Sequence, residues 1–572
     1  MTRAAAALAL ALLLAALAPV GAAATAPVAA SVDGAGAALA TGPSGPPAGP
    51  VPAVDESRIV ELLPNPVAAG DAGEYVLVAL PVGNWTVDDG ESRVTVRQNR
   101  AGRVVLTDDP DAPVAPPEGR VVGSGLSLSN AGERVALRRG GPDGPVVDAV
   151  EYGRAPEGER WLRWTDPPWR PVGLEPRPPV DFRPTNATAF LLPDAPGPPV
   201  EAIRNADRRV LLAGYTFGSE RVADELIAAH RRGARVRVLV EGDPVGGTDA
   251  RQARLLDRLA AGGVEVRVVA GPHARVRFHH AKYAVADGRA VVLTENWKPS
   301  GTGGADSRGW GVVLRSPAAA DALASLFRAD AGWRDAVAWR EFRAGRTFRV
   351  DEPATGRYPT RHPPADVRVE RTTLLTAPGN AEDGVVSVVD AADDRVDVIQ
   401  PTVADGPLLA SVRRAAERGV TVRLLLSNAW YVREENEALA GRLNRWADGA
   451  GVPFEARVAD PAGRYGKVHA KGVVADDVAV VGSLNWNPTS ARENREVVVA
   501  LEGEAVADYY RESFAADWRA SGERGGLRSL SPSLAVAAVA GAAAATLFVR
   551  RRFELASGRS GDGESEETGP IG

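Results

Sequence analysis

The hydrophobic pattern in the first third of the chain is typical of short strands. Between residues 58 and 153, apolar and β-branched runs such as EYVLVAL and ERVALRR are separated by Gly, Pro, Asn and Asp. Runs of this kind, broken by turn residues, predict strands, and several of them at short spacing predict a small β-sandwich. We therefore expect residues 56–155 to form an N-terminal β domain.

From residue 199 onward, strand-like runs alternate with helical patterns. The segment ERVADELIAAHRRG (220–233) places its apolar residues on one helical face and lies between two strand-like runs. The same order of strand, helix and strand returns at 394–429, and aligning Gly233 with Gly419 gives an offset of 419 − 233 = 186 residues. A repeat of this length predicts two copies of one α/β unit.

The segments between these units complete the expected organisation. We expect a connector rich in Pro and Trp at 156–198, a first α/β half at 199–350, a linker at 351–370 and a second half at 371–522. The chain is long enough for several domains of ordinary size.

Both ends of the chain carry apolar segments that predict targeting. Residues 1–26 have one cation, an apolar run and small residues suited to cleavage, as in a signal peptide, with an uncleaved anchor as the alternative. Residues 27–55 resemble a flexible Ala/Gly/Pro linker. Residues 533–549 are apolar and are followed by three arginines, which predicts a transmembrane helix and a cytoplasmic tail at 550–572, although a buried or surface helix remains open. We thus expect a single-pass protein of the cell membrane, with its main body outside the cell.

The composition excludes some chemistry and leaves one oddity. The 572 residues include no cysteine, so disulfides, thiolate nucleophiles and Cys-based metal sites are excluded. The net charge of −6 still allows a local basic groove for phosphate. Of the 67 Lys and Arg residues only four are lysines, Lys282, Lys298, Lys467 and Lys471, and all of them lie in two short stretches. Because Lys and Arg differ as chemical tools, this restriction indicates chemistry.

Those two stretches carry the same motif. The first half contains FHHAKYAVADG and the second KVHAKGVVADD, and each holds His-x-Lys-x-x-x-x-Asp. The residues are His280, Lys282 and Asp287 in the first half and His469, Lys471 and Asp476 in the second, at an offset of 469 − 280 = 189. Since the chain has only six histidines and four lysines, two such motifs at matching places in a repeat are not accidental.

The spacing of the motif suits phosphodiester chemistry. Residues i and i+2 of a strand project from one face, so a strand through HAK directs an imidazole and an ammonium to one point. Two such strands related by an approximate twofold axis present two His and two Lys to a shared site. Lysine neutralises non-bridging phosphate oxygens, while histidine attacks or transfers protons near neutral pH.

With these motifs the chain, from about Pro199 to Ala520, resembles the phospholipase D superfamily. The resemblance implies a duplicated fold of two mixed sheets flanked by helices, and a two-step reaction through a phosphohistidine. It implies His280 as nucleophile, His469 as general acid and base, Lys282 and Lys471 as phosphate ligands, and the motif aspartates as supports of the local geometry. It requires no metal and no cofactor, and one chain with both motifs is expected to act as a monomer on a phosphodiester substrate.

The segments that follow the motifs differ between the halves. In the second half GSLNWNPTSARENRE matches the family pattern, which places Ser483 and Asn485 near the phosphate and Glu496 against a histidine ring. The first half keeps Asn296 and has Thr294 in place of Ser, but Trp310 stands near the position of the expected Glu. We expect this loss to leave one His less well oriented, so that the site is asymmetric, slow, or reduced to binding.

The remaining candidates stay open. Residues 58–152 resemble the lamin-tail domain, an immunoglobulin-like β fold, by pattern rather than by catalytic residues. Lys298 and Lys467 contact a phosphate chain or merely flank the pocket, and Trp297 and Trp486 are expected to pack under the site rather than stack on bases. We favour a nuclease because GSLNW…ENRE is similar to the nuclease branch of the family. The alternatives are a phospholipase or phosphatidyltransferase, and a surface binding protein with a degenerate site.

Overall fold

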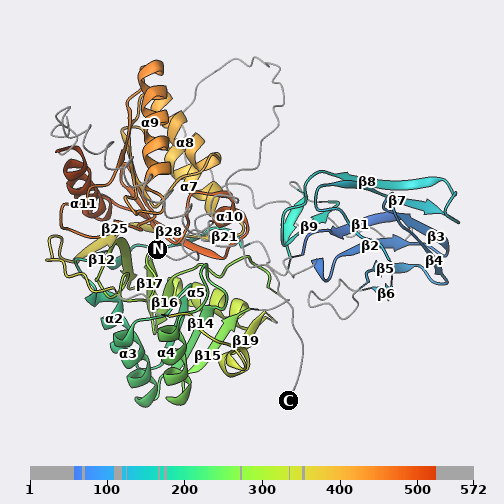
Figure 1. Cartoon of the computed structure of the whole chain (residues 1–572), viewed down its shortest axis with the longest axis horizontal. Helices are drawn as coiled ribbons and strands as arrows, with labels where there is room; N and C mark the ends of the chain where they lie inside the picture. Colours follow the sequence, from blue (N-terminus) through green and yellow to red (C-terminus); the bar gives the residue numbers. More distant parts are fainter. Residues whose placement is uncertain are drawn as a thin grey trace, which may run out of the picture.

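The computed structural model describes residues 57–66, 71–108, 119–123, 125–164, 168–172, 177–270, 274–333, 335–350 and 354–523. The expected signal peptide, the linker 27–55, the expected membrane helix and the tail 550–572 lie outside the described residues. A strand-rich lobe lies beside a larger body in which helices flank sheets (Figure 1).

The lobe is a β-sandwich. A six-stranded sheet in the order β10-β9-β1-β2-β5-β6 packs on a four-stranded sheet in the order β4-β3-β7-β8, and apolar residues of both sheets form one core. Strands β9 and β10 come from the segment expected as a connector, where β9 pairs with β1. The strands are β1 (Arg58–Leu63), β2 (Tyr75–Leu80), β3 (Gly83–Asp88), β4 (Arg93–Gln98), β5 (Gly102–Leu106), β6 (Arg120–Val122), β7 (Glu133–Arg139), β8 (Val146–Tyr152), β9 (Glu159–Leu162) and β10 (Trp169–Pro171).

The first α/β half is built on a mixed sheet. Its strand order is β19-β15-β14-β13-β16-β17-β18-β12-β20, with β25 of the second half attached to β18. Strands β13, β14 and β15 are parallel, whereas β16, β17 and β18 run antiparallel to their neighbours in this order. The attached strand β25 is parallel to β18. The strands are β12 (Thr185–Leu192), β13 (Arg209–Gly214), β14 (Arg235–Glu241), β15 (Glu265–Val269), β16 (Tyr283–Ala286), β17 (Arg289–Leu293), β18 (Ser307–Leu314), β19 (Ala336–Ala338) and β20 (Ala365–Val369).

The second half repeats this sheet apart from the edge strand β19, which has no counterpart beyond β24 in the described part of that half. Its order is β11-β21-β28-β27-β26-β22-β23-β24, with the same succession of parallel and antiparallel pairs. The duplicated fold expected from the offset of 186 is therefore confirmed. The strands are β11 (Val180–Phe182), β21 (Arg371–Ala377), β22 (Arg395–Gln400), β23 (Thr421–Leu426), β24 (Phe454–Val458), β25 (Lys467–Val468), β26 (Gly472–Ala475), β27 (Val478–Gly482) and β28 (Glu496–Glu502).

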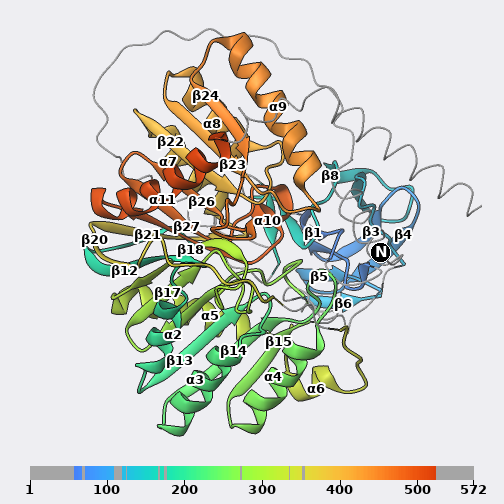
Figure 2. The ribbon, with the colours of Figure 1, turned by 60° about the vertical axis from the view of Figure 1, so that its left-hand side comes forward.

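Helices form the outer layers and also part of the interface between the halves (Figure 2). One apolar core combines α5, α11 and residues of both sheets. Each half has one further core, which lies under its outer helices. The helices are α2 (Gly197–Arg204), α3 (Glu220–Arg231), α4 (Ala250–Ala261), α5 (Pro317–Ala331), α6 (Trp339–Arg343), α7 (Ala381–Asp390), α8 (Pro407–Glu417), α9 (Arg433–Ala450), α10 (Pro488–Arg492) and α11 (Glu504–Glu523).

The repeated helix shows how local sequence sets these elements. The Ser219 hydroxyl accepts a hydrogen bond from the amide of Val222 and caps the start of α3, whose apolar face is buried. The chain leaves α3 through Gly233, at φ +103°, and leaves the matching helix α8 through Gly419, at φ +94°. Only glycine adopts this left-handed conformation without steric cost, so both copies end their helices in the same way.

The expected location in the cell membrane requires correction. Among the helices that the structure describes, none is both long and apolar enough to cross a bilayer. The longest, α11, carries acidic and basic residues along its length, and burying such charges in hydrocarbon is costly. The segment 533–549, on which the expectation depended, lies outside the described residues.

Candidate active site

The two motifs meet where the halves join. His280 and Lys282 directly precede β16, and His469 and Lys471 directly precede β26, so HAK forms the extended entry to each strand rather than part of it. The amide of His280 donates to the carbonyl of Arg495 at 3.0 Å, and the amide of His469 donates to the carbonyl of Arg308 at 3.0 Å. Each motif is thus held by the backbone of the opposite half.

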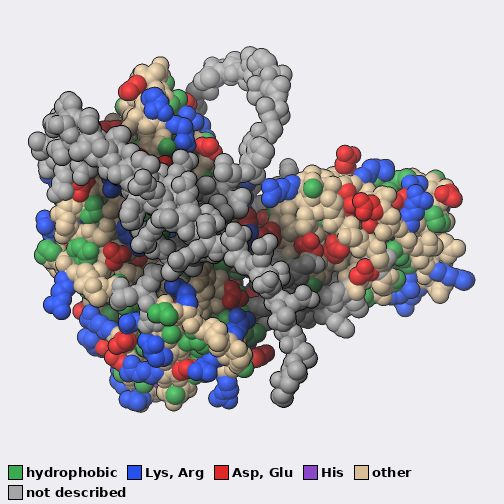
Figure 3. All heavy atoms as spheres, in the orientation of Figure 1, with side chains coloured by type: hydrophobic (Ala, Val, Ile, Leu, Met, Phe, Trp, Pro, Cys, Tyr) green, Lys and Arg blue, Asp and Glu red, His purple; other side chains and the backbone are tan. Residues whose placement is uncertain are grey.

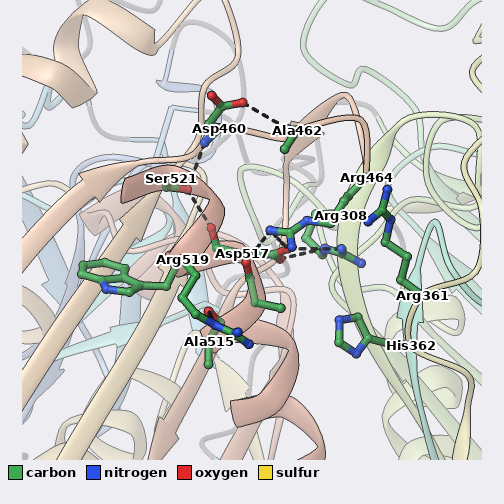
Figure 4. A network of polar contacts seen from close by, with 12 residues as sticks. Arg308, Arg361, His362, Asp460, Ala462, Arg464, Ala515, Asp517, Arg519 and Ser521 are labelled. Atoms are coloured by element: carbon green, nitrogen blue, oxygen red, sulfur yellow. Dashed lines mark hydrogen bonds and ion pairs between the residues drawn. The ribbon is translucent and has the colours of Figure 1, made fainter. Parts of the chain in front are cut away.

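Two buried arginines fix this junction. Arg495 donates twice to Asp330, at 2.9 Å for both contacts, and Arg308 lies 2.9 Å from Asp517. Figure 4 shows Arg308 pointing at Asp517, which Arg464 also contacts, at 3.0 Å. The Arg495–Asp330 and Arg308–Asp517 pairs each join one half to the other. These buried and paired side chains set the relative position of the halves, and with it the distance between the motifs.

The first-half histidine is held by the predicted carboxylate. Nδ1 of His280 lies 2.9 Å from both carboxylate oxygens of Glu496. Ser490 donates to the same carboxylate, as does Asn494 at 3.3 Å. Glu496 is fully buried, so this contact fixes the ring and directs its Nε2 away from the carboxylate.

The second-half histidine is held by a residue that sequence reasoning missed. Nδ1 of His469 lies 3.1 Å from Oε2 of Glu295, which is buried. Within the described structure this nitrogen has no aligned hydrogen bond, so the contact is close but less well directed than that of His280. Such contacts commonly tighten when substrate binds. Each histidine therefore receives a carboxylate from the opposite half.

Glu295 replaces a side chain that the first half lacks. The amides of Thr294 and Ser483 donate to the carbonyls of Trp310 and Val497, so the counterpart of Glu496 is the residue before Trp310, which is Gly309. A Cβ on Gly309 would lie 2.1 Å from Cγ of Glu295. The glycine thus leaves the space that the Glu295 side chain fills. The signal in the sequence was a glutamate inside the motif LTENW where the second half has leucine.

The two motif lysines are buried and lie beside both histidines. Nζ of Lys471 donates to the carbonyl of His469 at 2.6 Å and lies 3.5 Å from the carbonyl of Thr294 in the other half. Nζ of Lys282 donates to the carbonyl of His280. Burial lowers the pKa of Lys471 to about 8 and that of Lys282 well below its usual value. Two ammonium groups in so little water favour an anionic ligand.

All four lysines of the chain gather at this site. Each of them acts on the carboxyl of Glu295 by lowering its pKa, and each also lowers the pKa of His469. Nζ of Lys467 lies 3.4 Å from Asp306 and over the ring of Tyr431. The restriction of lysine to two stretches therefore corresponds to one cluster in space.

The carboxyl groups that hold the two histidines differ in the direction of their pKa shifts. Burial raises the pKa of Glu295 to about 8 despite the lysines. Burial opposes ionisation of Glu496 as well, but His280 and Lys282 lower the pKa of Glu496 below its usual value. Burial lowers the pKa of both His280, to about 4, and His469. The two carboxyl groups thus shift in opposite directions, with the pKa of Glu295 raised and that of Glu496 lowered.

The predicted polar residues after the motifs divide into two kinds. The hydroxyls of Thr294 and Ser483 accept from the amides of Trp310, at 2.9 Å, and Val497, at 3.1 Å, so they tie adjacent strands together. The side-chain amides of Asn296 and Asn485 make no hydrogen bond to any residue described, and the oxygen of Asn296 is buried. These two amides are the ones free to bind a ligand.

The motif aspartates lie at the far end of their strands. Asp287 accepts from the amides of Asp207, Arg208 and Arg209 at 2.9–3.0 Å. Asp476 accepts from the matching amides of residues 393–395. Both follow the four-residue strands that begin just after the lysines, roughly 13 Å along the chain. They anchor the turn to the neighbouring strand and are separated from the histidines.

The neighbouring aromatic and histidine side chains are structural. Trp297 and Trp486 are buried, as expected for packing under the site, and Nε1 of Trp297 donates to the carbonyl of Ala213. His279 is also buried, with Nε2 3.4 Å from Asp330. Each tryptophan thus packs in the core of its own half, whereas His279 forms a β-bridge with Arg495 of the other half.

Both halves match one known family. The profile of the family described as "Cardiolipin synthase, PLD-like domain" matches residues 200–331 and 385–518. No curated protein matches the chain.

Several solved structures are similar at low identity. The phosphatidylserine synthase of Haemophilus influenzae Rd KW20 is 13% identical, with a TM-score of 0.40, and the match covers 56% of this chain and 83% of that one. Nuc from Salmonella typhimurium, described as a phospholipase D family member, is 17% identical, with a TM-score of 0.23 and coverage of 28% and 98%. NucT from Helicobacter pylori is 16% identical, with a TM-score of 0.22 and coverage of 26% and 96%. All three TM-scores are below 0.5, so these likenesses say nothing about activity.

Proposed function

Because the two α/β halves of the chain belong to the phospholipase D superfamily, we propose that the protein is a phosphodiesterase that cleaves nucleic acid through a phosphohistidine. The observation that carries this proposal is the pair of histidines, each with a buried carboxylate from the opposite half at its Nδ1. A carboxylate at Nδ1 sets the tautomer and leaves Nε2 for the substrate.

The opposite pKa shifts of Glu295 and Glu496 support different roles for the two histidines. Neutral His280, held by ionised Glu496, has a free electron pair on Nε2 and acts as the nucleophile. Because the pKa of Glu295 is raised to about 8, the Glu295–His469 pair holds an additional proton near neutral pH and acts as the general acid. Pairs of titratable groups with opposite shifts of pKa mark such a division of labour, and the division agrees with the family's usual assignment of the first motif.

The reaction proceeds in two steps with balanced bonds. Nε2 of His280 attacks phosphorus, the bond from phosphorus to the leaving oxygen breaks, and His469 protonates that oxygen. His469 then takes a proton from water, whose oxygen attacks phosphorus, and the phosphorus–nitrogen bond breaks to regenerate His280. Lys282 and Lys471 neutralise the non-bridging oxygens, and the amides of Asn296 and Asn485 donate to them.

The purified protein with a chelator present provides the test. We expect turnover of single-stranded DNA and of bis-p-nitrophenyl phosphate, and a loss on the order of 10³-fold or more in His280→Ala and His469→Ala on DNA. His230→Gln, on α3, is the matched histidine control and retains activity. Equal inertness of wild type and variants on DNA, bis-p-nitrophenyl phosphate and phosphatidylglycerol vesicles would contradict an enzyme, and turnover of the lipid alone would contradict a nuclease.

A further inference from the structure

Two lysines of the site have no counterpart across the pseudo-twofold. Lys298 follows Trp297, whereas Asn487 follows Trp486; Lys467 precedes His469 by two residues, whereas Phe278 precedes His280 by two. The side chain of Asn487 caps α10 by accepting from the amide of Ser490 at 2.8 Å. The additional positive charge therefore lies only on the His469 side of the site.

These two lysines lie close to one another without full neutralisation. Burial lowers the pKa of Lys298, and the charge of Lys467 lowers it further. The ammonium of Lys298 has no hydrogen bond or ion pair with any residue in the described ranges. Lys467 has Asp306 at 3.4 Å, with about a third of its side chain exposed to solvent. Although burial opposes its charge, Tyr431 and Asp306 raise the pKa of Lys467, so Lys467 stays an ammonium beside Lys298. An anion placed between the two lysines would relieve their repulsion.

Exposed aromatic rings lie beside Lys467. Trp430 and Tyr431, in the loop after β23, are 77% and 40% exposed, and their rings meet edge to face at 5.6 Å. The ring of Tyr431 lies 5.7 Å from Nζ of Lys467. Aromatic rings beside cations are the usual device for binding an unpaired base together with its phosphate.

One outer face of the molecule carries mixed charge. On the face shown in Figure 3, basic and acidic side chains are intermixed over α3 and α4. The lysine cluster is thus a local concentration of charge beside the histidines rather than part of a broad basic stripe on that face.

We propose that Lys298, Lys467, Tyr431 and Trp430 form a second subsite, which binds the nucleotide next to the scissile phosphate on the leaving-group side. The lysines hold the adjacent phosphate and the rings stack on its base, so the substrate is a single strand with at least two consecutive phosphodiesters. A lipid with one phosphodiester leaves this subsite empty. This assignment rests on the proposed function, because it takes His469 as the acid for the leaving oxygen.

The number of phosphates in the substrate is the variable to test. The dinucleotide dTpdT has one phosphodiester and the trinucleotide dTpdTpdT has two. For wild type we expect kcat/KM to rise roughly 10- to 100-fold from the first to the second. The double variant Lys298→Ala Lys467→Ala is expected to lose this rise, and Trp430→Ala Tyr431→Ala to lose part of it.

A control that also removes two positive charges, but away from the site, is available in the first half. Arg231 and Arg235, at the end of α3 and the start of β14, are exposed and lie at the end of β14 away from the site. Arg231→Ala Arg235→Ala removes two cations and is expected to keep the rise. The thermal unfolding midpoint of each variant, compared with that of wild type, serves as the check that the protein has folded. Lys298→Gln and Lys467→Gln provide milder replacements.

The possible outcomes separate the two proposals. A wild type with equal kcat/KM on both oligonucleotides, or a rise that survives the double lysine variant, overturns the second subsite. Lysine-dependent turnover of phosphatidylglycerol vesicles without turnover of either oligonucleotide overturns it in favour of an anionic lipid surface. Inertness of wild type toward both oligonucleotides and bis-p-nitrophenyl phosphate overturns the proposed function itself.

Discussion

Glu295 and Gly309 form one functional unit in the active site. The glutamate occupies the space that the glycine leaves and brings its carboxyl to His469. In the second half the matching positions are Leu484 and Glu496, and there Glu496 brings its carboxyl to His280. The two halves thus exchange which of the two positions carries the acid.

This exchange predicts a rescue. Glu295→Leu removes the carboxyl from His469 and is expected to lower kcat on DNA roughly 10- to 100-fold, the usual effect of losing a supporting group of this kind. Gly309→Glu alone collides with Glu295. The double variant Glu295→Leu Gly309→Glu reproduces the second-half arrangement and is expected to recover most of kcat. A double variant no better than Glu295→Leu would mean that the carboxyl does not act through His469.

The shifted pKa values predict the pH profile of kcat/KM. Because burial lowers the pKa of His280 to about 4, the nucleophile is neutral across the physiological range and the acid limb falls near pH 4 rather than 6.5. Burial brings the pKa of both Lys471 and Glu295 to about 8. Above that pH the site loses the ammonium and the acid proton, so activity declines.

Glu295→Gln tests the direction in which the alkaline limb moves. On bis-p-nitrophenyl phosphate, whose leaving group needs no proton, the alkaline limb reports Lys471. The carboxylate of Glu295 raises the pKa of Lys471, so its removal is expected to move this limb to lower pH, with the acid limb unchanged. The measurement is kcat/KM on bis-p-nitrophenyl phosphate as a function of pH. An alkaline limb that stays in place, or a wild-type acid limb at 6.5, is incompatible with these assignments.

At the scale of elements, the motifs depend on backbone hydrogen bonds between segments of the two halves. Arg495 extends its backbone along the segment before His280 and its side chain to Asp330. Although burial opposes ionisation, Arg495 keeps the pKa of Asp330 below its usual value. Removal of one partner leaves a buried charge without compensation.

Arg495→Ala is therefore expected to lower the free energy of unfolding by about 3–5 kcal/mol. Arg371→Ala breaks an exposed ion pair with Glu502 in the same half and is expected to cost about 1 kcal/mol or less. Chemical denaturation followed by tryptophan fluorescence compares the two. Similar small losses in both variants would show that the junction does not depend on the buried pair.

At the scale of the whole molecule, the sequence predicts the repeat well because duplicated strands, helices and motifs share a measurable offset. The halves carry matching sheets, and the histidines, lysines and Glu496 lie at one site. Glu295 was not predicted, because its role depends on the space above Gly309, which a one-dimensional pattern does not contain. The convergence of Lys298 and Lys467 on His469 likewise depends on the packing of one half against the other.

The N-terminal sandwich shows a similar limit. Its first strands follow the apolar runs between turn residues, but β9 and β10 lie in a Pro- and Trp-rich segment whose composition indicated a connector. They join the sheet through pairing with β1, a long-range contact that local composition does not reveal. The lamin-tail resemblance of this domain stays a prediction.

The central claim is a covalent bond between phosphorus and His280. The test uses His469→Ala with bis-p-nitrophenyl phosphate, because p-nitrophenolate leaves without a proton whereas the second step still needs His469 to activate water. We predict that acid-free quenching and mass spectrometry find a p-nitrophenyl phosphoryl group on His280 that accumulates in this variant and is absent from His280→Ala. No adduct in His469→Ala, or an adduct on His469 in His280→Ala that turns over as in wild type, would contradict the account.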